Sequence, residues 1–265
     1  MGQPRGCDKR RKNRFFWGLQ DPEQCNHLQR IAVEESRLGI PLLFGLDVIH
    51  GHRTVFPIPL AESCSFDDEV FAHSVEIAAR EASSESVNWT FAPMVDTARD
   101  ARWERVAEIA GEDPYLTSRY TAVKVRGFQG DNLSDSDRLI ACAKHFAAYS
   151  AAIGGCDYNF ADMSLQTLWN IYLPPFHAAC EAGVATLMSA FQNLNGIPCT
   201  ENRYLLRSVL RERFGFKGFV VSDADSVGEC VAHGTAEDRR DAACKVVNAG
   251  VNVDIVSDCY LEHME

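Results

Sequence analysis

The sequence of 265 residues has ten cysteines, but no two of them are separated by only two residues. Structural zinc sites commonly draw ligands from such pairs, so their absence speaks against a zinc-stabilised domain. The cysteines are scattered and lie mostly inside apolar segments, which is typical of buried free thiols in a reducing compartment. We therefore expect no metal and no other cofactor.

A long apolar run is also missing, so the sequence contains no candidate for a membrane-spanning helix. Its basic start is not followed by the apolar core of a secretory signal. These features favour a cytoplasmic protein that does not enter a membrane, with secretion or periplasmic export as the alternative if the N-terminus is incomplete. Residues 1–22 are expected to be a disordered, basic N-terminal segment.

Positive charge is scarce, because the net charge is -11, and this argues against nucleic acid as a partner. Hydrophobic residues make up 46% and charged residues 24% of the chain, as in globular proteins. The length fits one large domain, which we place at residues 23–265. Nothing in the composition indicates an oligomeric state.

Apolar strands and amphipathic helices alternate along this domain. The expected strands share short, continuously apolar runs, and they cover residues 39–47, 87–93, 139–146, 184–191, 219–221 and 251–256. The expected helices show helical periodicity, and they cover residues 67–84, 113–130, 164–183, 202–215 and 236–250. Such alternation predicts a parallel sheet covered by helices. We expect no strand–helix unit before Gln24.

Polar or special residues stand at the C-terminal ends of these strands. They are Asp47, Pro93, Lys144 with His145, Phe191, Asp223 and Asp254. Residues gathered at strand C-termini are typical of the active face of a (β/α)8 barrel. About six strand–helix units are present, so the predicted fold is an α/β, TIM-type barrel that is incomplete.

A carboxylate, Asp223, directly follows the apolar run of residues 219–221, and it could act as a nucleophile or merely cap the next helix. Asp47 could bind hydroxyl groups or pair with Arg53. Carboxylates accept hydrogen bonds from vicinal hydroxyls, while Lys, Arg and His donate to other hydroxyls. A pocket that holds both acceptors and donors therefore suits a sugar. Lys144 and Arg105 are expected to keep Asp223 ionised.

Several stretches resemble the barrel domain of family 3 glycoside hydrolases, the β-glucosidase and β-xylosidase group. They are "GIPLLFGLDVIHGHRTVFPIPL", "NWTFAPMVDTARDARWERVAEIAGEDPYL", "AKHFAAY", "YLPPFHAACEAGVATLMSAFQNLNG" and "LLRSVLRERFGFKGFVVSDADSVGE". They occur in the family's order from about Gln24 to about Val256. The chain departs from the family at Ala101, Glu104 and Ile109, where Pro or Gly is usual.

The resemblance implies a retaining glycosidase that acts on a β-linked glucoside or short oligosaccharide. It makes Asp223 the nucleophile. Asp47, Arg105, Lys144 and His145 become sugar-binding residues, and Phe191 falls where many members have a Tyr near the nucleophile. The general acid/base of the glucosidase branch is a Glu from a separate C-terminal domain, so it is expected outside this chain.

Three other functions compete with this one. A metal-dependent barrel hydrolase could use His50 and His52 with Lys144 and Asp223, although an ordering role in their loop is the simpler interpretation of the two histidines. A class I aldolase would form a Schiff base on Lys144. A truncated barrel without catalytic activity, which binds sugar weakly or does not fold alone, is the strongest rival for this chain.

Overall fold

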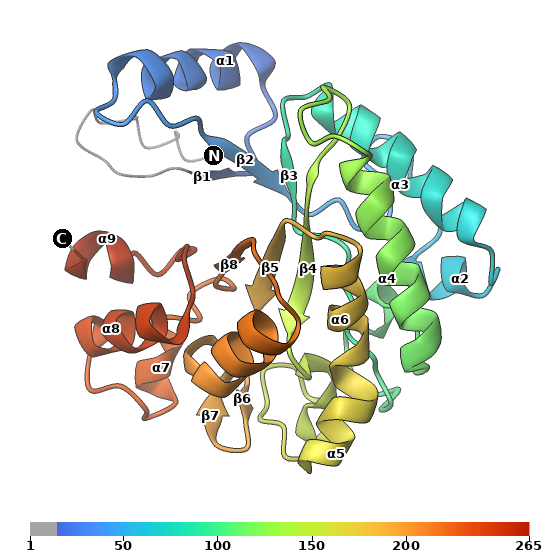
Figure 1. The fold of residues 1–265 in the computed structure, drawn as a ribbon, viewed down its shortest axis with the longest axis vertical. Coiled ribbons are helices and arrows are strands. Elements are labelled where there is room, and N and C mark those ends of the chain that lie inside the picture. The colour runs from blue at the N-terminus through green and yellow to red at the C-terminus, as the bar shows by residue number, and fades with distance from the viewer. Residues whose placement is uncertain (1–14, 265) are drawn as a thin grey trace.

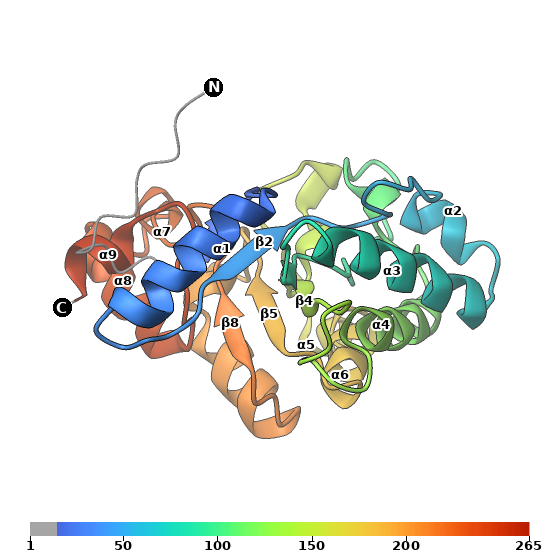
Figure 2. The ribbon, with the colours of Figure 1, turned by 90° about the horizontal axis from the view of Figure 1, so that it is seen from above.

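The computed structural model describes residues 15–264, and its centre is a sheet of six parallel strands in the order β1-β2-β3-β4-β5-β8. The strands are β1 (Phe15–Trp17), β2 (Leu43–Leu46), β3 (Trp89–Thr90), β4 (Ile140–Phe146), β5 (Thr186–Ser189) and β8 (Phe219–Val221). The sheet curls into a half-barrel with helices around its outside (Figures 1 and 2). The predicted incomplete α/β barrel is confirmed.

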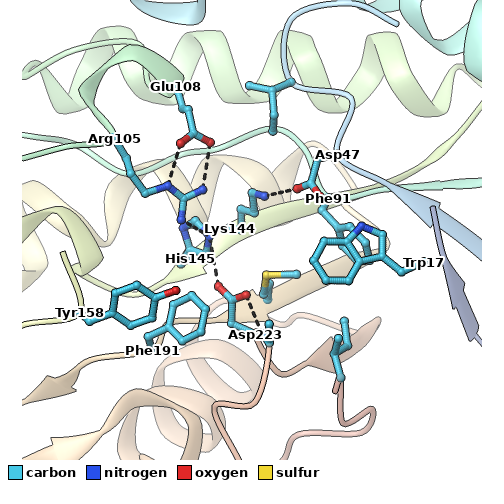
Figure 3. A pocket seen from close by; sticks show the side chains of 14 residues that line it. Trp17, Asp47, Phe91, Arg105, Glu108, Lys144, His145, Tyr158, Phe191 and Asp223 are labelled. Carbon is cyan, nitrogen blue, oxygen red and sulfur yellow. Dashed lines mark hydrogen bonds and ion pairs between the residues drawn. The ribbon is translucent and has the colours of Figure 1, made fainter. Parts of the chain in front are cut away.

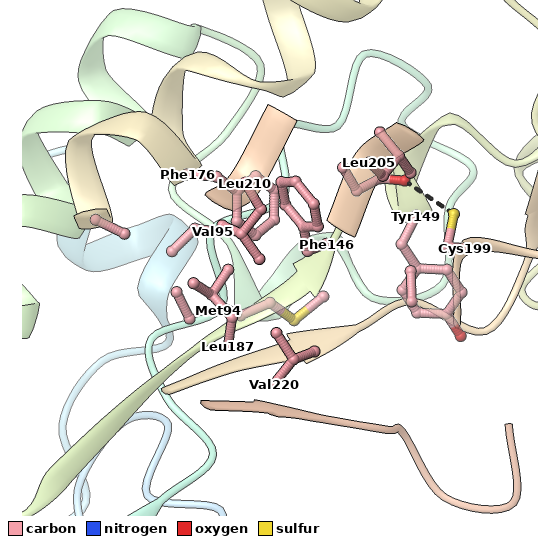
Figure 4. Packing of buried hydrophobic residues seen from close by; sticks show 14 of the residues in the cluster. Met94, Val95, Phe146, Tyr149, Phe176, Leu187, Cys199, Leu205, Leu210 and Val220 are labelled. Carbon is pink, nitrogen blue, oxygen red and sulfur yellow. Dashed lines mark hydrogen bonds between the residues drawn. The ribbon is translucent and has the colours of Figure 1, made fainter. Parts of the chain in front are cut away.

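Side chains of the strands alternate between two apolar clusters. Both faces of the sheet are therefore buried, which explains why the strand sequences are continuously apolar. Along β4, Ala141 and Ala143 belong to the outer cluster beneath the helices, whereas Cys142 belongs to the inner cluster. In β5, Leu187 and Met188 divide in the same way. Figure 4 shows the outer cluster, where strand side chains pack against helices.

The helices connect successive strands. They are α1 (Pro22–Arg30), η1 (Ile31–Glu35), α2 (Pro59–Ser63), α3 (Asp68–Ser83), η2 (Val106–Glu108), α4 (Pro114–Gln129), η3 (Tyr149–Ala151), η4 (Ile153–Gly155), α5 (Leu165–Thr167), η5 (Leu168–Tyr172), α6 (Pro174–Glu181), η6 (Cys199–Glu201), η7 (Tyr204–Arg213), α7 (Glu229–Ala232), α8 (Arg239–Ala249) and α9 (Cys259–His263). The strands β6 (Asn193–Leu194) and β7 (Ile197–Pro198) form a separate antiparallel pair. Within the described range, no helix has the length and apolar character needed to cross a membrane.

Local sequence signals account for the longer helices. Asp67 and Asp113 cap α3 and α4, because their carboxylates accept hydrogen bonds from backbone N–H groups of the first turns. The adjacent Pro174 and Pro175 end one helix and begin α6, since a proline ring cannot continue a helix but fits its first turn. These three helical segments were predicted from the sequence.

Two predictions about the ends of the sheet are wrong. β1 was not expected, because a three-residue apolar run after a basic stretch is shorter than a typical strand. It lies within the segment 1–22 that was predicted to be disordered, and residues 1–14 of that segment are outside the described range. Residues 251–256 contribute only one bridging pair, Val221 with Val253. The side chain of Asn252 accepts the backbone N–H of Val220 at 2.9 Å, and a side chain thereby replaces one bond of a regular ladder.

Candidate active site

All six residues predicted for the site line one cavity of about 340 Å³ at the C-terminal ends of the strands (Figure 3). They are Asp47 after β2, Arg105 before η2, Lys144 and His145 in β4, Phe191 after β5 and Asp223 after β8. Parallel strands bring these positions to one edge although they are far apart in sequence. The structure thus places the six side chains together, while their roles stay predictions.

Lys144 and Asp47 form an ion pair across the cavity, with 2.6 Å between Nζ and Oδ1. The Lys144 side chain is buried and that of Asp47 is 37% exposed, so Asp47 can still be reached from the cavity. The alternative partner considered for Asp47 was Arg53. Arg53 instead pairs with Glu85, and that alternative is wrong.

Arg105 is held by a residue that the sequence analysis missed, Glu108. The Nε and Nη2 atoms of Arg105 donate to the two carboxylate oxygens of Glu108 at 2.7 and 2.9 Å. Burial opposes the charge of Glu108, yet its hydrogen bonds with Arg105 lower the pKa of Glu108 overall. The i,i+3 spacing of the two residues was the available signal. The guanidinium group of Arg105 is thereby fixed at the wall of the cavity.

His145 lies between two carboxylates. Its Nδ1 is 3.0 Å from Oδ2 of Asp96, a buried acid in the segment after β3, and its Nε2 is 3.3 Å from Oδ2 of Asp223. Burial, together with the cations Arg105 and Lys144, lowers the pKa of His145 well below its usual value. His145 is therefore a neutral imidazole at pH 7. Asp96 was not predicted, because nothing in its sequence context distinguishes it from a structural aspartate.

Asp223 is buried, with 9% of its surface exposed, and it does not cap a helix. Its Oδ1 accepts the backbone N–H of Ala224 at 2.7 Å, whereas α7 begins after Gly228. The helix-cap alternative is therefore wrong. Within the described residues Oδ2 has no well-formed hydrogen bond; it is shielded from solvent and faces Nε2 of His145, while the Asp223 side chain as a whole lines the cavity.

The cations Lys144 and Arg105 are only one of the influences on the pKa of Asp223. Burial raises its pKa from 3.8 to about 6, and Lys144 and Arg105 act in the opposite direction without outweighing burial. The two cations lower the pKa of Asp223 as expected, but they do not bring it below its usual value. Desolvation of the charged form is the larger effect at this depth. Asp223 is still mostly ionised at pH 7.

Aromatic side chains form the remaining wall of the cavity. Phe191 and Tyr158 lie with ring centroids 4.5 Å apart on one side, and Trp17 and Phe91 lie at 6.3 Å on another. Trp17 was missed because its segment was expected to be disordered. It is 54% exposed, which leaves an aromatic face available to a ligand. Apolar faces beside polar groups suit the C–H faces of a sugar ring.

The two histidines considered as metal ligands have other partners. His50 Nδ1 lies 3.1 Å from the carbonyl oxygen of Phe56, and His52 Nε2 lies 2.7 Å from Glu85. The first contact is the predicted side-chain to backbone bond of an ordered loop. Across residues 15–264 no group of three or more His, Cys, Asp or Glu side chains could hold a metal ion. Asp254, the further pocket acid considered, bonds Ser257 and lines a neighbouring cavity.

Comparison with known proteins gives one consistent family. A family model described as "Glycosyl hydrolase family 3 N terminal domain" matches residues 16–265. A "Periplasmic beta-glucosidase" of Salmonella typhimurium is 44% identical over 242 residues, which cover 91% of this chain and 32% of that protein. A "Beta-xylosidase" of Formosa agariphila is 39% identical over 248 residues, covering 88% of this chain and 34% of that protein.

Solved structures agree with the sequence comparison. A crystal structure of "beta-glucosidase from Listeria innocua in complex with glucose" superposes with a TM-score of 0.91 and 42% identity, covering 94% of this chain and 35% of that one. The same enzyme in complex with isofagomine gives a TM-score of 0.90. The chain therefore spans about one third of the length of the relatives that it matches.

Proposed function

The chain belongs to glycosyl hydrolase family 3, and from this premise we propose that it is the nucleophile-bearing domain of a retaining, β-glucosidase-like enzyme. One observation carries the proposal. The carboxylate of Asp223 lines a cavity that also holds Asp47, Lys144 and Arg105, and one of its two oxygens has no hydrogen bond among the described residues. A carboxylate that lines a cavity beside fixed donors and acceptors suits attack on a bound sugar.

The proposed first step is a displacement at the anomeric carbon. A lone pair on a carboxylate oxygen of Asp223 forms a bond to that carbon, and the bond from the carbon to the leaving oxygen breaks with its electron pair passing to the oxygen. The product is a glycosyl ester on Asp223. Attack by water then breaks the ester and restores the carboxylate, so that two inversions give net retention.

Ligands for the sugar hydroxyls surround this position. Asp47 accepts hydrogen bonds, and Lys144 and Arg105 donate them, each already held in place by its ion-pair partner. Fixed partners lessen the entropy lost when a ligand is bound. Phe191 and Trp17 supply apolar faces for the ring. We propose a β-linked glucoside or short oligosaccharide as the substrate, in keeping with the glucose and isofagomine complexes of the Listeria innocua relative.

A second carboxyl must protonate the leaving oxygen, about 5–5.5 Å from the nucleophile in retaining enzymes. Among the described residues of the cavity, Asp47 and Glu108 are each ion-paired, so neither is a suitable proton donor. We propose that a glutamate of a further domain, outside these 265 residues, supplies the proton. The small share of the relatives' length that this chain covers supports that expectation.

The experiment offers the 265-residue chain β-glucosides that differ in their leaving groups. General acid catalysis contributes roughly 10²–10⁴-fold, and it matters least when the leaving group is a weak base. We expect negligible turnover of alkyl β-glucosides and slow release of one equivalent of dinitrophenolate from dinitrophenyl β-glucoside. Azide should then release β-glucosyl azide from the stalled ester. Asp223→Asn should abolish the release, whereas Glu112→Gln, which changes an exposed acid that does not line the cavity, should not. Equal release from both variants would refute the proposal.

A further inference from the structure

The buried contact between Asp96 and His145 has no role in the proposed displacement. Asp96 is 2% exposed and does not line the cavity. Its Oδ2 accepts the backbone N–H of His145 at 2.9 Å and also lies 3.0 Å from His145 Nδ1. Its Oδ1 has no hydrogen-bond partner among residues 15–264. An ionised carboxylate in such a place would keep a largely uncompensated charge away from water.

The other ring nitrogen, Nε2, has two competing neighbours. Oδ2 of Asp223 lies at 3.3 Å, and Nη1 of Arg105 lies at 3.4 Å. Arginine only donates and an ionised carboxylate only accepts, so one neighbour needs a bare Nε2 and the other needs a protonated one. Both distances exceed that of a well-formed hydrogen bond, as is common in a site without substrate. The position of the imidazole proton decides which contact forms.

We propose that Asp96 is a positioning residue that sets the tautomer of His145 and thereby places the negative charge on Asp223. When Asp96 carries a proton, its Oδ2–H donates to Nδ1, and Nε2–H of the neutral imidazole donates to the carboxylate of Asp223. When Asp96 is ionised, Nδ1–H donates to Asp96, and the bare Nε2 accepts from Arg105. This inference rests on the proposed function, since it describes how the nucleophile of that reaction is held.

The proton count balances at a fixed total. Consider Asp96 ionised, His145 protonated at Nδ1 and Asp223 protonated at Oδ2. Transfer of the Asp223 proton to Nε2 and of the Nδ1 proton to Asp96 leaves Asp96 neutral, His145 neutral and Asp223 ionised. The two arrangements differ in which carboxyl bears the charge. The negative charge is more stable on Asp223, because Lys144 and Arg105 are close to it and part of its surface is exposed. Asp96 is almost completely buried.

The electrostatic setting of His145 agrees with this assignment. Burial raises the pKa of Asp96 to about 7 and that of Asp223 to about 6, so Asp96 is the carboxyl that keeps its proton longer as the pH rises. Several further titratable or charged groups surround the imidazole, from its own strand and from other elements. They are Arg105 and Glu108 at η2, Lys144 in β4, Asp47 after β2 and Tyr149 in η3.

The test is the tautomer of His145 in the whole chain, measured by two-bond ¹⁵N–¹H correlations of the imidazole rings without any substrate. The signal is assigned by its loss in His145→Gln. At about pH 6.5, between the pKa values of about 6 for Asp223 and about 7 for Asp96, we expect the neutral Nε2–H form. At pH 8.5 we expect the Nδ1–H form. An Nδ1–H form or an imidazolium at pH 6.5 would overturn the proposal.

Asp96→Asn gives a second readout that a merely structural role would not change. The amide cannot ionise, so the tautomer of His145 should no longer depend on pH between 6.5 and 8.5. Asp100→Asn, the same change at a partly exposed site outside the cavity, should keep the wild-type dependence. A pH-dependent tautomer in Asp96→Asn contradicts the proposal. If that variant does not fold, the wild-type spectra decide alone.

Failure of the positioning role proposed for Asp96 can be distinguished from failure of the proposed function. The expected tautomers with no covalent sugar on Asp223 would leave the positioning role standing and refute the glycosidase. A labelled Asp223 with the Nδ1–H form at pH 6.5 would support the glycosidase and refute the role of Asp96.

Discussion

The ammonium of Lys144 lies 2.6 Å from the carboxylate of Asp47, and this pair joins the ends of β4 and β2 across the intervening strand β3. The pair fixes a donor and an acceptor side by side at the cavity, which is the arrangement that vicinal hydroxyl groups need. It also engages the amine that a class I aldolase would need free for a Schiff base. The ion pair thus favours hydroxyl binding over the aldolase alternative.

Asp47 should contribute directly to sugar affinity. Hydrogen bonds to charged groups contribute about 1.5–3 kcal/mol, so Asp47→Asn should weaken binding of isofagomine about 10–100-fold. Titration calorimetry at pH 7 measures the effect. Asp100→Asn serves as the control, because Asp100 pairs with Arg102 away from the cavity. Equal affinities of Asp47→Asn and the wild type would remove Asp47 from the binding site.

Trp17 should provide an aromatic face for the ligand. Trp17→Ala is expected to weaken isofagomine binding roughly 3–10-fold, since aromatic contacts contribute about 0.5–1.5 kcal/mol beyond burial of area. Tyr115→Ala removes a comparably exposed ring at the start of α4 and should have no effect. If both variants bind isofagomine like the wild type, Trp17 does not contact the ligand.

Removing the charge of Asp223 should stabilise the fold at alkaline pH. Its pKa is raised from 3.8 to about 6, so its contribution to stability is fully present below 3.8 and is lost as the pH rises through 6. Asp223→Asn should therefore raise the free energy of unfolding at pH 8 by about 1–3 kcal/mol, with little change at pH 4. Urea unfolding at both pH values measures this. A variant that is less stable than the wild type at pH 8 would contradict the account.

A buried ion pair outside the cavity should dominate the stability of the outer layer. Lys124 in α4 contacts Glu62 in α2 at 2.5 Å and Ser74 in α3 at 3.0 Å, and the charged groups of the pair are almost completely buried. Lys124→Met leaves Glu62 without its cation and should cost about 3–5 kcal/mol in denaturant unfolding. The solvent-accessible pair of Arg102 and Asp100 is the control, and Arg102→Ala should leave the denaturant midpoint almost unchanged. Similar losses in the two variants would contradict this view.

The sequence predicted the parts of the site that follow directly from strand ends. Asp47, Lys144 and Asp223 each stand where an apolar run stops, and parallel strands must bring such positions together. Glu108 and Asp96 could not be found in this way. Asp96 acts through His145, and that contact depends on a distance across the sheet that strand periodicity does not contain. Glu108 acts through Arg105 in a segment outside the strands, where only the i,i+3 spacing of the two residues indicated the pair.

The edges of the sheet were the least predictable part of the fold. A central strand is marked by apolar residues on both faces, but β1 is only three residues long and follows a basic stretch. Its neighbours supply what its own sequence lacks, because Phe15 packs its ring against Trp89 at 5.1 Å and against Phe91 at 5.7 Å. Trp17 was overlooked for the same reason.

If Asp223 is the nucleophile, a trapped glycosyl-enzyme carries the sugar on its carboxylate. Dinitrophenyl 2-deoxy-2-fluoro-β-glucoside has a good leaving group, and its fluorine slows breakdown of the ester, so the first step needs little help from an acid. After incubation, proteolysis and mass spectrometry should find one fluoroglucosyl group, on the peptide that contains Asp223. Asp223→Asn should carry no label. A label on any other residue of the chain, or no label on a protein shown to be folded, would contradict the account.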